Sequence, residues 1–163
     1  MKRLAIVLLL MLFAGVAEAG VEARWAFTFA DPDGRLTYVY RILLVSGTLE
    51  PGSAHSQHVT LYDVPRLIPD SPSTLPDWVA SVQTTGIDAD DIPLNGRDDA
   101  PKLLNVTWSW NGTAPIVAPH DFGLVSFDIT SGGTTAMRLF VGQSTGPLDT
   151  SRALIGRTRG PQP

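Results

Sequence analysis

The stretch Leu104–Asn111 limits the fold most strongly, because its side chains alternate between apolar and polar. One parity holds Leu104, Val106, Trp108 and Trp110, and the other holds Asn105, Thr107, Ser109 and Asn111. A period of two residues is that of a β-strand with one face against a core. An α-helix would spread the same residues around its axis. We therefore expect a strand that buries two indoles and turns Asn105 toward solvent.

Further segments of strand character are separated by Gly, Pro, Asp and Asn. They are Arg24–Ala30, Leu36–Ser46, His58–Val64, Trp78–Thr84, Phe122–Ile129 and Ala136–Val141. In Arg24–Ala30, the rings of Trp25, Phe27 and Phe29 share one parity, which predicts one aromatic, buried face. The turn Asp31–Gly34 leads into Leu36–Ser46, which is apolar on both parities in its second half and is expected in the middle of a sheet.

The remaining segments complete an all-β prediction. In Phe122–Ile129 the apolar parity changes, which indicates a strand covered on both faces or one with a bulge. Pro65–Pro76 contains four prolines and is expected to be irregular, since proline cannot donate to a ladder. After Gly142 we expect only one short strand, around Ala153–Ile155. Together the segments predict a single antiparallel β-sandwich, jelly-roll-like, of about seven to eight strands over residues 20–163, with an irregular C-terminal tail.

The first 19 residues have the three parts of a secretory signal peptide. Met1–Arg3 is basic, Leu4–Val16 is apolar, and Ala17–Ala19 places small residues at the cleavage positions. A retained membrane anchor is the alternative, but the apolar run is short for a span of about 20 residues. We expect cleavage after Ala19 and a secreted or periplasmic protein without stable membrane insertion.

Composition narrows the partners. Without its signal peptide the chain has 144 residues, with 10 basic and 15 acidic side chains and a net charge of −5 (10 − 15). This charge argues against nucleic acid and anionic membranes as partners, because both need a basic surface. The chain contains no cysteine, which excludes disulfides, thiol catalysis and thiolate metal ligands.

We assign no catalytic, cofactor-binding or metal-binding residue from the sequence. His55, His58 and His120 could be drawn together around a metal, but ordinary loop polarity is the favoured interpretation. The clusters Asp31–Gly34 and Asp88–Asp91 offer the oxygen ligands that calcium prefers, but turn-forming aspartates explain them better.

Catalysis has weak support in the sequence. Ser46 lacks the preceding glycine of the G-x-S-x-G nucleophile elbow, and no glycine-rich phosphate loop is present. A pair of glycosidase carboxylates could come from distant strands, so a hydrolase stays as the weaker alternative. The expected protein is not an enzyme.

The tryptophans provide a second alternative. Indoles exposed on a β-sandwich can form a platform on which sugar rings stack, as in carbohydrate-binding modules, and Trp108 or Trp110 could serve in this way. Core packing is the more common use of an indole at strand spacing. A polysaccharide or another cell-surface molecule is therefore the partner class to consider.

Six short motifs occur in the same order as in a known group of exported domains. They are Tyr38–Tyr40, Leu61–Asp63, Trp78–Val82, Val106–Gly112, Leu124–Phe127 and Phe140–Thr145. In these motifs the chain resembles the exported domains of bacterial PEP-CTERM proteins. The resemblance implies a non-enzymatic protein of the cell surface or extracellular matrix. The chain departs from that group at Gly160–Pro163, where a sorting tail would carry Pro-Glu-Pro, a transmembrane helix and arginines, so a released protein is expected.

Overall fold

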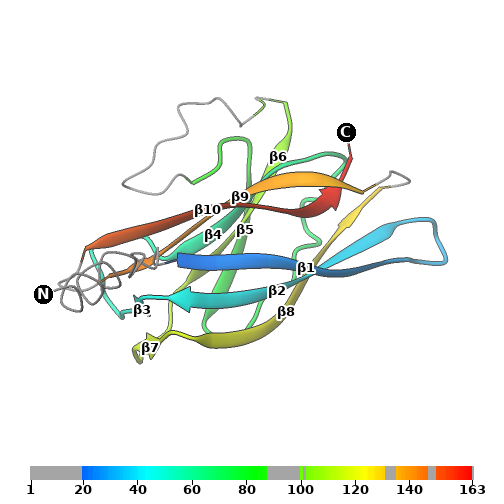
Figure 1. Ribbon diagram of the computed structural model, residues 1–163. Helices are drawn as coiled ribbons and strands as arrows, with labels where there is room; N and C mark the ends of the chain where they lie inside the picture. Colours follow the sequence, from blue (N-terminus) through cyan, green and yellow to red (C-terminus); the bar gives the residue numbers. More distant parts are fainter. Residues whose placement is uncertain (1–19, 88–99, 101, 131–134, 147–149, 163) are drawn as a thin grey trace, which may run out of the picture.

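The chain folds into antiparallel strands that form two packed sheets (Figure 1). The computed structural model describes residues 20–87, 100, 102–130, 135–146 and 150–162. Within them lie ten strands: β1 Gly20–Ala30, β2 Leu36–Ser46, β3 Thr48–Leu49, β4 His58–Val64, β5 Trp78–Gln83, β6 Leu104–Trp110, β7 Ile116–Val117, β8 His120–Ile129, β9 Thr135–Thr145 and β10 Ser151–Pro161. None of the described residues forms a helix that could cross a membrane.

The smaller sheet has the order β1-β2-β8, with β2 in the middle as its apolar sequence predicts. The larger sheet has seven strands in the order β5-β6-β4-β9-β3-β7, and β10 pairs with β9 along its whole length. The antiparallel β-sandwich predicted from the sequence is therefore confirmed. Eight of the described strands have six residues or more, and β3 and β7 have two each.

The irregular C-terminal tail was a wrong prediction. β9 continues to Thr145, and β10 is an eleven-residue strand rather than a short one around Ala153–Ile155. The alternation of apolar and polar side chains is obscured in this region, because glycines occupy two positions at which the side chain of another residue packs closely against the strand. A Cβ on Gly156 would lie 2.5 Å from the Phe140 ring, and one on Gly160 would lie 2.6 Å from Arg138 Cγ. These positions therefore lack the apolar side chains by which a strand is recognised.

Aromatic side chains fill the space between the sheets. Tyr38 and Tyr40 of β2 stack on Phe127 of β8, with ring centroids 5.9 and 5.6 Å apart. Opposite them lies the fully buried indole of Trp108, which donates from Nε1 to the carbonyl oxygen of Ser73 at 2.9 Å. The predicted burial of the Trp108 and Trp110 indoles is thus confirmed, with Trp110 8% exposed.

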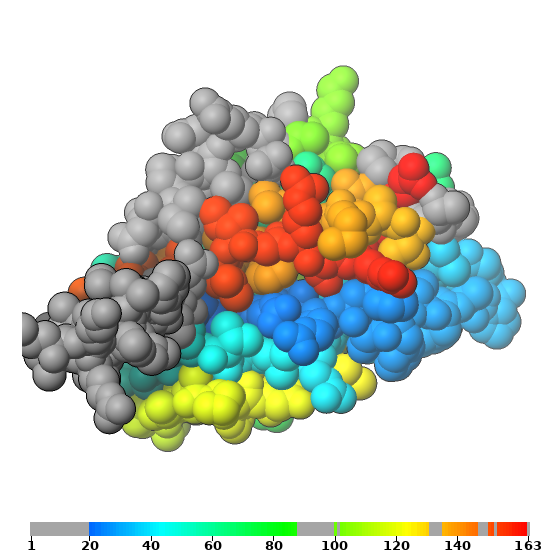
Figure 2. Space-filling view, viewed as in Figure 1, coloured from blue at the N-terminus to red at the C-terminus, as the bar shows by residue number. Residues whose placement is uncertain are grey.

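A bulge changes the direction of the aromatic side chains in β1. The pairing of β1 with β2 shifts between Trp25 and Phe27, so Phe27 and Phe29 leave the parity of Trp25. Both phenyl rings are nearly half exposed, with centroids 6.3 Å apart. The prediction that these two rings face the core was therefore wrong. They lie toward the tip of the β1–β2 hairpin, which projects at one end of the molecule (Figures 1 and 2).

The second face of β4 and β6 is also buried. The prediction that Asn105 faces solvent was therefore wrong. Its side-chain oxygen accepts from the backbone N–H of Asp63 at 2.8 Å, and Asn105 is fully buried. Thr60 and Thr107 share a hydrogen bond of 2.8 Å on the same face. The carbonyl oxygen of Ile87 contacts Tyr62 and His58 there, at 2.9 and 3.1 Å. Hydrogen bonding explains how this face can be both polar and buried.

The proline-rich connection is irregular, as predicted, and runs beside β8. Ser73 donates its backbone N–H to the carbonyl of Ser126 at 2.8 Å, and its Oγ accepts from the backbone N–H of Ser126 at 2.7 Å. Ser71 Oγ accepts in the same way from the backbone N–H of Asp128 at 2.8 Å. Serine hydroxyls thus replace ladder partners that proline cannot supply. Of the two alternatives predicted for β8, a bulge is present, at Phe122–Gly123, where the pairing with β2 shifts.

The buried hydroxyl of Tyr40 is expected to lower the free energy of unfolding at alkaline pH. Burial raises the pKa of its hydroxyl, Tyr38 adds to the rise, and the hydroxyl donates to the carbonyl of Arg159 at 2.7 Å. Below about pH 10 the phenol is protonated in both folded and unfolded chains, so this contribution to stability is complete. Above about pH 10 the Tyr40 phenol ionises in the unfolded chain but not yet in the folded chain. The free energy of unfolding then falls by up to about 1.4 kcal/mol per pH unit. We expect Tyr40→Phe to have a shallower fall than wild type in urea unfolding between pH 9 and 11. Equal slopes would contradict this role.

Candidate functional site

Two hollows open at the end of the sandwich where β6 finishes and β8 begins. The first has a volume of about 370 Å³ and lies between the loop Glu50–Gln57 and residues Ser109–Gly112. The second has about 220 Å³ and is lined by Pro76, Asp77, Trp110, Ile116 and His120–Phe122. Trp110 lines both. The backbone N–H of Asn111 donates to the carbonyl of Asp77 at 2.8 Å, which joins the walls of the two hollows.

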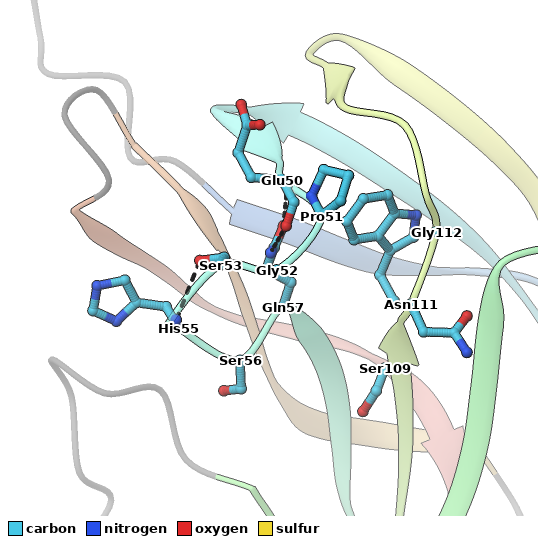
Figure 3. Close-up of a pocket in the computed structure, with 11 residues that line it drawn as sticks. Glu50, Pro51, Gly52, Ser53, His55, Ser56, Gln57, Ser109, Asn111 and Gly112 are labelled. Atoms are coloured by element: carbon cyan, nitrogen blue, oxygen red, sulfur yellow. Dashed lines mark hydrogen bonds between the residues drawn. The ribbon is translucent and has the colours of Figure 1, made fainter.

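The loop of the first hollow is held in shape by Gln57. Its side-chain oxygen accepts from the backbone N–H of Glu50 at 2.6 Å, and its Nε2 donates to the carbonyl of Glu50 at 2.7 Å. The Gln57 carbonyl also accepts from the N–H of Trp110 at 2.8 Å. Figure 3 shows the loop on one side and Ser109 and Asn111 on the other, with the side chain of His55 directed away from them. The hollow is therefore preformed.

An aromatic wall lines the second hollow. The Phe122 ring packs edge-on against Trp78, with centroids 5.0 Å apart, and His120 lies on Phe122 at 4.6 Å. Trp78 is buried, Phe122 is half-buried and His120 is exposed. This order gives a rigid apolar base with an imidazole at the solvent side.

Trp110 forms the boundary between the hollows without presenting an open ring face. Its Nε1 is buried and has no hydrogen-bond partner among the described residues, and the same holds for Nε1 of its cross-strand neighbour Trp78. Gly112 lies directly on the indole, since a Cβ there would be 2.5 Å from Cζ2 and 2.8 Å from Nε1. The missing side chain lets the Asn111–Gly112 turn cover the ring.

Both hollows are acidic. Among the residues that the structure describes, their linings include Glu50, Asp77 and Asp121 but neither lysine nor arginine. Asp121 is paired with Arg41 at 3.2 Å. The carboxylates of Glu50 and Asp77 form no ion pair with any described residue. They remain available as hydrogen-bond acceptors, and they disfavour an anionic ligand.

The three histidines are not brought together. His55 lines the first hollow, His120 lines the second, and His58 is fully buried with its Nδ1 3.2 Å from Ser56 Oγ. Over the part of the chain that the structure describes, no three metal-ligating side chains form a group.

The aspartates of the β1–β2 turn act as turn residues. The backbone N–H of Gly34 donates to the carbonyl of Asp31 at 2.9 Å, and the carboxylate of Asp33 pairs with Arg35 at 2.6 Å. The second acidic cluster considered for calcium, Asp88–Asp91, lies outside the described residues. Ser46 was considered as a nucleophile. Its backbone carbonyl oxygen accepts a hydrogen bond from Ser144 Oγ at 3.2 Å.

The burial of Trp108 and Trp110 removes the ring faces that a stacking platform on strand β6 requires. The sequence does not indicate the residues that line the hollows as one group, because five separate segments contribute them. The turn pairs Pro51-Gly52 and Asn111-Gly112 were the available signal, since such pairs mark loops at strand ends. Comparison of the chain with protein-family models, curated proteins and solved structures gives no match.

Proposed function

We propose that the chain is an exported, non-catalytic β-sandwich that works at the cell surface or in the extracellular matrix. The motifs shared with PEP-CTERM-type exported domains and the signal-peptide pattern of Met1–Ala19 support this proposal. The observation that carries it is the pattern of Met1–Ala19, which ends directly before a residue of the sandwich. Gly20, the residue that would follow cleavage, is buried in β1 and pairs with Ser46. Cleavage after Ala19 would leave this pairing in place.

Export is tested by expressing the full chain in a bacterial host and measuring the mass of the protein outside the cytoplasm. We expect a mature product that starts at Gly20. The matched control replaces both small residues of the cleavage pattern, as Ala17→Leu with Ala19→Leu, and is expected to keep the precursor mass. A wild-type product that retains Met1 and stays in the cytoplasm would refute the proposal.

Carbohydrate binding is the second candidate function. The observation that favours it is the pair of hollows at the β6–β8 end, where hydroxyl, amide and carboxylate groups surround an aromatic base. Ligand sites commonly combine apolar rings with a few polar groups that fix orientation. In this form of the hypothesis the strand indoles support the site from below and do not stack on the sugar.

A further inference from the structure

We propose that the two hollows together bind one glycan chain that carries no acidic groups, with consecutive sugar units on the two sides of Trp110. This inference rests on the carbohydrate-binding candidate and specifies its residues and ligand class. The shared residue Trp110 and the hydrogen bond between Asn111 and Asp77 make the hollows neighbours. A chain of two or more units would contact both.

The first hollow supplies hydrogen bonds. The hydroxyl of Ser109 has no hydrogen-bond partner among the described residues, and Glu50 keeps its carboxylate unpaired while its backbone is held by Gln57. Sugar hydroxyls are both donors and acceptors, so they suit a hydroxyl and a carboxylate placed around one opening. Bonds that involve a charged acceptor are the stronger ones.

The second hollow supplies an aromatic contact. The exposed imidazole of His120, supported by Phe122 and Trp78, offers a surface for the apolar C–H face of a sugar ring. Asp77 lies beside it with an unpaired carboxylate. Its backbone has a φ of 63°, in the left-handed region, and Asp77 directly precedes β5.

The acidic lining determines which glycans fit. Glu50 and Asp77 would repel uronate or sulfate groups, and the mature chain carries net negative charge in addition. This repulsion is long-ranged at low salt, where the screening length is about 30 Å at 0.01 M. A polymer without acidic groups avoids the penalty.

The test is affinity electrophoresis of the mature chain in gels that contain dextran, hydroxyethylcellulose or alginate. We expect retardation by at least one neutral polymer and none by alginate. Ser109→Ala, Asp77→Asn and His120→Ala should each weaken binding about threefold to tenfold, as expected for the loss of one hydrogen bond or ring contact. Thr84→Ala, at an exposed threonine outside both hollows, is the matched control and should bind as wild type.

Each other outcome identifies what is wrong. Retardation by a neutral polymer that survives in all three variants places the glycan elsewhere and overturns this inference, while carbohydrate binding itself stands. Retardation by alginate alone overturns the charge argument. Absence of retardation on every polymer, with folding verified by a cooperative urea transition, overturns both the inference and the carbohydrate-binding candidate. Export is measured separately and is unaffected by these results.

Discussion

Gly142→Ala is expected to prevent stable folding of the sandwich. Strand β1 crosses β9 at this glycine, and a Cβ on residue 142 would overlap the carbonyl oxygen of Val21 and lie 2.7 Å from its carbonyl carbon. Backbone atoms cannot move aside as a flexible side chain can, so the two sheets would have to separate. We expect a loss of more than about 4 kcal/mol in the free energy of unfolding, or no cooperative transition in urea.

The matched control is a glycine that has space around it. Gly34 has a φ of +86° and no atom within 4 Å of an added Cβ. Asparagine tolerates this backbone conformation better than other non-glycine residues, so Gly34→Asn should cost less than about 1 kcal/mol. If Gly142→Ala unfolds at the same urea concentration as wild type, β1 does not cross β9 as the structure describes.

Trp108→Ala is expected to cost about 3–5 kcal/mol, the range for truncating a fully buried large aromatic residue. The indole is 0% exposed and lies among the apolar side chains of both sheets. Its Nε1 also holds the carbonyl oxygen of Ser73 at 2.9 Å, so the substitution leaves that oxygen without its donor. Urea unfolding followed by circular dichroism measures the loss.

Trp108→Phe separates packing from hydrogen bonding. The phenyl ring keeps most of the apolar volume but donates no hydrogen bond, so we expect a cost of about 1–3 kcal/mol. Trp25→Phe is the comparison at a half-buried indole and should cost less than Trp108→Phe. Equal losses for Trp108→Phe and Trp108→Ala would show that the bond to Ser73, and not the volume of the ring, provides the stabilisation.

Much of the strand layout could be predicted because the alternation is strong where one face is buried. Leu36–Ser46 and His58–Val64 match β2 and β4 residue for residue, and Leu104–Asn111 extends one residue beyond β6. Turn residues set the boundaries in these cases, as Asp31–Gly34 does before β2. Local chemistry was sufficient for these elements.

Contacts between distant segments could not be predicted in the same way. Parity in β1 depends on one bulge residue, which reverses the direction of Phe27 and Phe29. Burial of Asn105 depends on a partner at Asp63, and β10 depends on close approaches at its glycines. The hollows lie where Glu50–Gln57, Pro76–Asp77, Ser109–Gly112 and His120–Phe122 meet, and nothing local in any of these segments indicates the others.

The meeting of the first and last strands has a consequence for when the protein can fold. The backbone N–H of Trp25 in β1 donates to Thr158 Oγ1 in β10 at 2.9 Å, across 133 positions of the chain. Contacts of such long separation make folding slow, because loop closure must precede them. The β1–β10 contact therefore forms only after residue 158 has emerged. For a chain that crosses a membrane in extended form, as we propose, β1 therefore lacks its β10 partner until residue 158 has crossed.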